Sequence, residues 1–215
     1  MKRLLLLLLA LLLLLSSCTD KPHVFAKSED GTGYVDEKTG IFYRLLEGPY
    51  EPLASGETVG EYCNEKSGVS REFRAIPDLD SALFLADGNL NVYFSGQSMT
   101  PADQWAPSIL LVCEEEVISV ERKRFTAGTD DAAIARMLGL WFGTEVATLP
   151  LKTPQISYRL KLSGTLYPNL LYCFSFLYYG EGEAYFYDPI GRHTVALPED
   201  VIALICPAHV LGQGG

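Results

Sequence analysis

A histidine and a cysteine are the side chains in this chain that could take part in catalysis. His193 follows a turn and lies five residues after Asp188, and a histidine beside an aspartate can act as a general base. Cys63 could serve as the nucleophile of such a base if folding brought the two together. However, Cys63 lacks the helix-start setting that activates a cysteine, and a turn histidine bonded to a local carbonyl is the more common case. We therefore assign no catalytic residue and favour a role without catalysis.

Signatures of metal and cofactor sites are missing from the sequence. It contains no His-Glu-x-x-His, no Cys-x-x-Cys and no glycine-rich phosphate-binding loop. The segment 78–80, Asp-Leu-Asp, lacks the glycine and the distal glutamate of an EF-hand calcium loop. Three glutamates at 114–116 could bind calcium, but a solvated acidic loop is the simpler interpretation. We expect neither a metal nor a cofactor.

Aromatic and basic side chains are better candidates for a binding surface. Trp105 lies in a loop segment, so we expect it to be an exposed contact residue. Arg159 and Lys161 alternate with apolar residues and should lie on the wet side of a strand. The aromatic residues of 172–187 could form a platform for stacking if they are uncovered. Packing beneath a helix that contains Trp141 is the interpretation we favour for them.

The C-terminal part of the chain predicts an antiparallel meander over about 156–197. Residues 156–162 alternate strictly between apolar and polar side chains, which is typical of a half-buried strand. Two β-rich runs on either side of a Gly-Glu-Gly turn at 180–182 then predict a hairpin, and a short strand at 193–197 follows. Further strand candidates are 41–46, 69–76, 90–94, 109–113 and 117–125.

Three short helices complete the predicted fold. Pro77 precedes a first helix at 78–86, and Thr129 is a suitable N-cap for a second helix with an apolar stripe that ends at Trp141. Pro198 opens a third helix that would dock on the sheet. Because strands dominate without regular β-α-β alternation, the fold class is α+β with a mainly antiparallel sheet in a single domain. We place this globular domain at 34–210 and a disordered tail at 211–215.

Four cysteines follow residue 18 in the sequence. Cys113, Cys173 and Cys206 lie in apolar runs, as buried thiols do, whereas Cys63 lies among polar residues. An exported protein can oxidise its cysteines, and four of them allow three disulfide connectivities that the sequence does not rank. We favour free, buried thiols.

The N-terminal eighteen residues carry the most specific motif. Lys2 and Arg3 precede an apolar run at 4–15, and Ser-Ser-Cys18 follows. This arrangement predicts a secretory signal peptide, because the apolar run is shorter than the roughly 20 residues that a membrane-spanning helix needs. The segment 15–18, Leu-Ser-Ser-Cys, resembles the lipobox of bacterial lipoproteins. The resemblance implies removal of residues 1–17, attachment of a diacylglycerol to the Cys18 thiol, and frequent acylation of the new amino terminus. An ordinary secretory signal or an uncleaved anchor is the alternative.

An acylated Cys18 would make the lipid bilayer the first partner of this protein. It would place the chain at the cell membrane, lipid-anchored on the extracytoplasmic face. The polar residues up to 33 predict a flexible tether, so the lipidated cysteine and the tether together span 18–33. Without residues 1–17, the chain has 15 basic and 27 acidic residues, a net charge of −12. We expect no nucleic-acid partner, because phosphate backbones repel such a chain.

These features favour a protein-, peptide- or glycan-binding module at the cell envelope. One alternative is an extracytoplasmic hydrolase with a site near Cys63 or His193. Another is a structural protein of envelope assembly, which would have no small ligand and no concave pocket.

Overall fold

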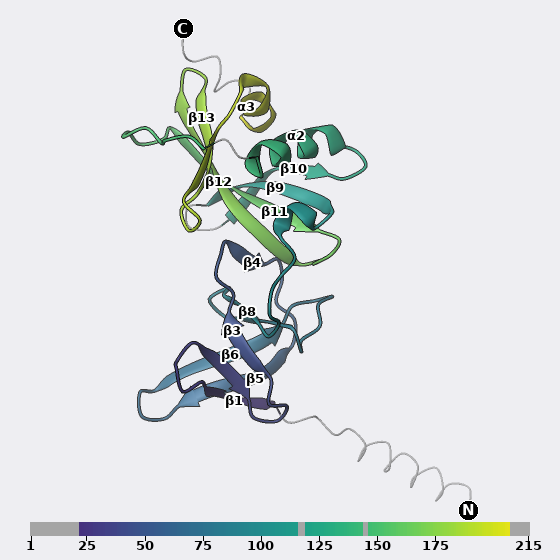
Figure 1. Cartoon of the computed structure of the whole chain (residues 1–215), viewed down its shortest axis with the longest axis vertical. Helices are drawn as coiled ribbons and strands as arrows, with labels where there is room; N and C mark the ends of the chain where they lie inside the picture. The colour runs from purple at the N-terminus through teal and green to yellow at the C-terminus, as the bar shows by residue number, and fades with distance from the viewer. Residues whose placement is uncertain (1–21, 116–118, 144–145, 207–215) are drawn as a thin grey trace, which may run out of the picture.

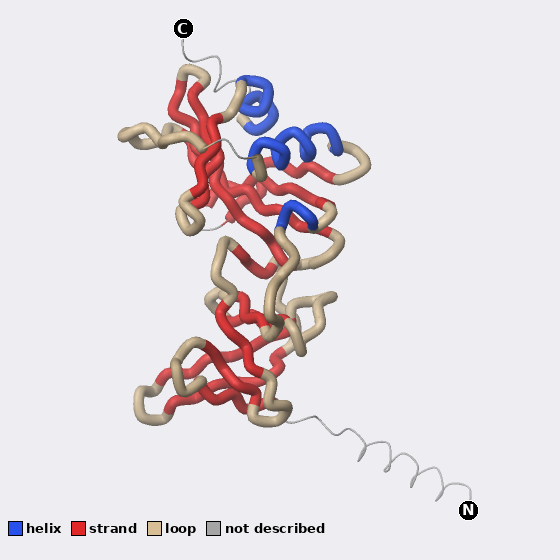
Figure 2. Tube along the Cα trace, viewed as in Figure 1, coloured by secondary structure: helices blue, strands red, loops and turns tan. Residues whose placement is uncertain are grey.

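The computed structural model describes residues 22–115, 119–143 and 146–206, which build a closed β-barrel and an open sheet (Figures 1 and 2). The barrel forms the lower part of the molecule in Figure 1, and the sheet with its helices forms the upper part. Strand β4 (Tyr50–Pro52) lies between them and pairs with the sheet. The predicted signal peptide, Cys18 and the predicted tail at 211–215 lie outside the described residues.

Seven short strands close the barrel in the order β1-β2-β3-β8-β7-β6-β5. Their bounds are β1 (His23–Lys27), β2 (Gly33–Asp36), β3 (Phe42–Leu45), β5 (Thr58–Asn64), β6 (Val69–Ala75), β7 (Phe84–Asp87) and β8 (Val92–Phe94). All neighbours are antiparallel except β1 and β5, which run parallel with His23 opposite Gly60. A Cβ atom at Gly60 would lie 2.1 Å from the His23 carbonyl oxygen, so the parallel seam requires glycine there.

Aromatic rings fill the barrel interior. The enclosed cluster consists of Phe25, Tyr34, Tyr43, Phe73, Leu85 and Tyr93. The ring centroids of Phe25 and Phe73 are 4.5 Å apart, and such contacts add about 0.5–1.5 kcal/mol to the energy of burial. Buried Asp87 lies among these rings, 3.0 Å from an Arg71 nitrogen. The Arg71 guanidinium also lies 5.5 Å from the centroid of the Tyr34 ring, in a cation–π contact. The buried Asp87 carboxylate therefore has a charge partner that an aromatic ring holds in position.

The upper sheet is antiparallel, with the strand order β10-β9-β11-β12-β13-β14. Its strands are β9 (Pro107–Glu115), β10 (Ser119–Thr126), β11 (Ile156–Gly164), β12 (Leu170–Gly180), β13 (Glu183–Asp188) and β14 (His193–Ala196). Strands β11 to β14 are consecutive neighbours, which confirms the predicted meander at 156–197.

Two of the three predicted helices are present in the described part of the chain. Helix α2 (Asp131–Trp141) and helix α3 (Glu199–Ile205) pack into the same hydrophobic core against the sheet. The predicted helix at 78–86 is wrong: Asp78 has a φ of 62°, residues around Asp80 form a turn, and residues 84–87 form β7. All four side chains of β7 are buried, and a helix with one apolar stripe would not place them so. A single 3₁₀ turn, η1 (Ala102–Gln104), was not predicted. The class is α+β at the coarse level, with strands dominant.

The predicted tether at 18–33 is also wrong over most of its length. Residues 23–27 form β1, and Phe25 points into the barrel core. The His23 imidazole lies 2.7 Å from the buried Asp36 carboxylate, so the start of β1 is fixed to the end of β2. Four residues, 19–22, separate Cys18 from the first strand.

An aromatic cluster joins the barrel to the sheet. Phe84 and Phe94 of the barrel share it with Trp105 and with Leu170 of β12. The Tyr50 ring of β4 stacks on Trp105 with centroids 5.9 Å apart. The two β structures therefore share buried apolar surface as well as the β4–β12 hydrogen bonds.

Candidate functional site

The structure does not bring the two candidate catalytic residues together. Cys63 is exposed on β5 of the barrel, opposite Ser70. His193 lies at the start of β14 in the upper sheet, where its Nε2–H donates to the Trp141 carbonyl oxygen at 2.8 Å. That carbonyl belongs to the last turn of α2, so the histidine satisfies an orphan acceptor at a helix end. The nucleophile–base pair of Cys63 and His193, which we considered but did not favour, is therefore not formed.

Trp105 is a core residue and not a surface contact. Its exposed fraction is 0%, and its indole N–H donates to the Thr100 carbonyl at 2.9 Å. The rings of Tyr50, Tyr167 and Tyr172 surround it. The expectation of an exposed tryptophan fails because the 3₁₀ turn before it directs the ring into the junction between barrel and sheet.

Arg159 and Lys161 form part of a partly buried ion-pair group, not a wet binding face. Their side chains are only 23% and 12% exposed. Each donates to a carboxylate oxygen of Glu51 at 3.0 Å. The alternation on β11 is as expected, but β4 pairs with β12 and places the Glu51 side chain on the same face of the sheet as Arg159 and Lys161. These two side chains therefore join β11 to β4.

The aromatic residues of the hairpin lie on two faces of the sheet. Tyr172, Phe174 and Phe176 belong to the core under α2, where Trp141 stacks on Phe174 at 4.5 Å. Tyr185 pairs with Leu177 and so points to the opposite side. The core interpretation is confirmed, and the single stacking platform is not formed.

Strand geometry argues against disulfides among the described cysteines. Cys113 on β9 and Cys173 on β12 are separated by β11, and two strand spacings of about 4.8 Å exceed the Cα separation that a disulfide spans. Cys206 packs in the core beneath the helices, and Cys63 lies in the barrel. Burial raises the pKa of Cys206 to about 11 and raises that of Cys173 further, so these thiols stay protonated.

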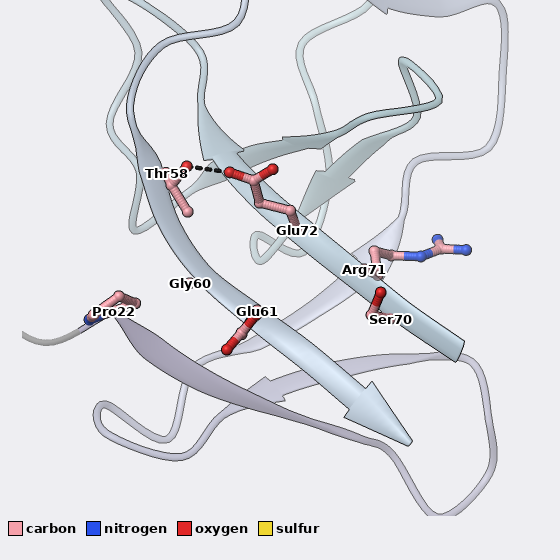
Figure 3. A pocket seen from close by; sticks show the side chains of 7 residues that line it. All are labelled: Pro22, Thr58, Gly60, Glu61, Ser70, Arg71 and Glu72. Carbon is pink, nitrogen blue, oxygen red and sulfur yellow. Dashed lines mark hydrogen bonds between the residues drawn. The ribbon is translucent and has the colours of Figure 1, made fainter. Parts of the chain in front are cut away.

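A pocket of about 340 Å³ opens on the outside of the barrel between β1, β5 and β6 (Figure 3). It is lined by Pro22, Thr58, Gly60, Glu61, Ser70, Arg71 and Glu72. Figure 3 shows the Thr58 hydroxyl bonded to Glu72, while the Arg71 side chain points away from both of them, and its guanidinium contacts Asp87 and the Tyr34 ring. Glu61 and Glu72 are direct cross-strand partners, so two carboxylates lie on the same outer face.

The chemistry of this pocket suits a ligand that donates hydrogen bonds. The Thr58 hydroxyl and then the Arg74 guanidinium lower the pKa of Glu72, so its carboxylate is ionised at neutral pH. With Glu61 and the hydroxyl of Ser70 beside it, the pocket offers mainly acceptor oxygens. A sugar hydroxyl or an ammonium group matches such a lining better than a phosphate does.

Sequence reasoning missed the pocket because β5 was not predicted. The alternation at 58–64 is interrupted by a β-bulge between Thr58 and Gly60, which shifts the period by one residue. The exposed Glu61 and Cys63 on either side of Tyr62 are the remaining signal of a strand in this segment.

Metal-binding clusters and helices that could span a membrane are absent from the described residues. Within residues 22–115, 119–143 and 146–206, no three His, Cys, Asp or Glu side chains gather closely enough to hold a metal ion. None of the helices in the same ranges has the length and hydrophobicity needed to cross a bilayer.

Comparison with protein families, with curated proteins and with solved structures found no match to this chain.

Proposed function

We propose that this protein is a lipoprotein held at the extracytoplasmic face of the cell membrane by acyl chains on Cys18. The observation that carries the proposal is the order of features in residues 1–18: two basic residues, a short apolar run, two serines and a cysteine. Burial of acyl chains contributes about 0.8 kcal/mol per CH₂ group, so two or three chains hold a folded domain durably.

We further propose that the folded part is a binding module for a peptide or a glycan. The acceptor-rich pocket at Glu61 and Glu72 supports this role. The hydrolase alternative loses its proposed pair, because Cys63 and His193 lie in different β structures. The alternative of a purely structural envelope protein expects no concave pocket, and it is less well supported for that reason.

The anchor is tested by the substitution Cys18→Ala, with Cys63→Ala as a matched control. The unmodified protein should fractionate with membranes and partition into detergent. Cys18→Ala should appear in the soluble fraction or persist as an uncleaved precursor, whereas Cys63→Ala should behave like the parent. Unchanged acylation and membrane retention of Cys18→Ala would end the lipoprotein proposal.

The binding role is tested on glycan and peptide arrays with purified protein. Glu72→Gln should weaken any ligand that the parent retains, because the ionised acceptor is removed. Glu65→Gln is the control: this side chain is exposed in the β5–β6 turn and does not line the pocket. Equal loss in both variants would show that the pocket is not the binding site.

A further inference from the structure

The outer side of strands β1, β2 and β3 carries a continuous row of apolar side chains. The alternate residues Phe25, Tyr34 and Tyr43 point into the barrel, so their neighbours point outward. The outward row is Val24, Ala26, Val35 and Phe42, which we call the apolar row. Ala26 lies opposite Val35, and Val35 lies opposite Phe42, so the row crosses all three strands.

The two ends of the apolar row are exposed to solvent. Val24 is 55% exposed and Phe42 is 40% exposed. A Cβ atom at Gly33 would lie 2.6 Å from the Phe42 ring, so the ring covers the glycine of the neighbouring strand. Adjacent strands are about 4.8 Å apart, and the row from Ala26 to Phe42 therefore spans about 10 Å.

The apolar row lies where the chain leaves toward Cys18. Only residues 19–22 separate Cys18 from β1, and Val24 is the second residue of that strand. An extended chain covers at most about 3.6 Å per residue, so the Cα atom of Cys18 lies within about 18 Å of that of His23. This short link keeps the barrel close to the bilayer and the outer side of β1 within reach of it.

Charge favours the same side of the barrel. Residues 23–45 contain three basic and four acidic residues, and one of the acids, Asp36, is buried against His23. Residues 46–100 contain three basic and nine acidic residues. Bacterial bilayers are rich in anionic lipids, so the strands β1 to β3 are the part of the barrel that such a surface repels least.

We propose that the apolar row rests on the lipid bilayer, so that the barrel is next to the membrane and the upper sheet projects away from it. This inference depends on the proposed acylation of Cys18. The loop between α2 and β11, which carries the fully exposed Leu151, projects from the upper part of the molecule (Figure 1) and would remain in water. The pocket at Glu61 and Glu72 would open beside the membrane surface.

The test uses the acylated full-length protein reconstituted in vesicles of zwitterionic and anionic phospholipids with brominated chains. Phe42→Trp and Val24→Trp each place a fluorescent probe in the apolar row, and Leu151→Trp is the control. The native Trp105 and Trp141 are buried and give the same background in every variant. Flotation of the vesicles reports the anchor independently of fluorescence.

If the apolar row rests on the bilayer, brominated lipids quench the added emission of Phe42→Trp and Val24→Trp and leave that of Leu151→Trp unchanged. The two probes also shift to shorter wavelength when vesicles are added. Flotation without quenching at either probe, or equal quenching at Leu151→Trp, overturns the orientation and leaves the lipoprotein proposal standing. Failure to float overturns both. Two separate probe positions guard against one variant that does not fold.

Discussion

Glu51 and Arg159, which are 108 positions apart in the chain, form an ion pair of 3.0 Å between strands β4 and β11 of the upper sheet. Lys161 bonds the second oxygen of the same carboxylate at 3.0 Å. All three side chains are less than a quarter exposed, so solvent screens these interactions weakly. One carboxylate on the short strand β4 thus pairs with two cations of β11.

Glu51→Gln should destabilise the protein by about 2 kcal/mol, because it removes the carboxylate charge that two partly buried cations share. Urea unfolding measures the loss. The control is Glu183→Gln, which removes a solvent-exposed pair with Lys152 and should change the free energy of unfolding little. Equal effects of the two substitutions would contradict the assigned importance of Glu51.

Trp105→Ala should cost about 3–5 kcal/mol of stability, because it leaves a cavity among three tyrosine rings at the junction. Thermal unfolding followed by circular dichroism reports the change. Leu166→Ala alters a half-exposed side chain and should stay within about 0.5 kcal/mol of the parent. A small effect of Trp105→Ala would mean that the junction contributes little to folding.

Thiol titration should give different counts before and after unfolding. Cys63 is exposed, whereas Cys113, Cys173 and Cys206 are buried, so one thiol of the four should react in the folded mature protein at pH 8. Unfolding without a reductant should make all four reactive. If two or four thiols stayed missing after unfolding, the chain would contain disulfides, against the strand geometry.

Stability should fall at acid pH partly through Asp36. Burial alone would raise the pKa of this carboxyl, but hydrogen bonds from the Thr39 hydroxyl, the Lys38 backbone and His23 outweigh it and lower the pKa. A lowered pKa in the folded state gives stability that is complete above the unfolded pKa of about 3.9 and is lost as the pH falls below it.

Asp36→Asn removes this titration. Unfolding free energies between pH 3 and pH 7 should therefore decrease less steeply toward acid in Asp36→Asn than in the parent. Both proteins share the other acidic groups, so the difference between the curves below about pH 5 isolates Asp36 from its partner His23. Parallel curves below pH 4 would show that its pKa is the same in the folded and unfolded states.

The upper sheet was predictable because its strands are long and regular. Residues 156–162 keep one periodicity for seven positions, and α2 has a full apolar stripe from Ile134 to Trp141. In both segments the local pattern and the tertiary environment agree, so hydrophobic periodicity was sufficient.

The barrel was not predictable by the same means. Its strands β2, β3, β7 and β8 have three or four residues, too few to establish a period, and β5 contains a bulge. In β7 all four side chains are buried, so no alternation remains to be seen. The short apolar run Val24-Phe25-Ala26 between polar residues was the one local sign that residues 23–27 belong to a folded element.

The exposure of the candidate surface residues was predicted wrongly because the residues that cover them are distant in the sequence. Nothing near Arg159 or Lys161 in the sequence indicates that Glu51 lies over them, since β4 reaches β12 from more than one hundred residues away. The same holds for Trp105, which is enclosed by tyrosines at 50, 167 and 172.

The parallel pairing of β1 with β5 determines where the N-terminus of this protein can be truncated without opening the barrel. A version that begins at residue 34, on the view that everything earlier is linker, would lack all of strand β1 and the first residue of β2. The backbone groups of β5 that β1 satisfies would then face water, as an open edge ready to recruit another copy. Aggregation of such a shortened protein would result from the absence of β1 and not from an intrinsic lack of solubility.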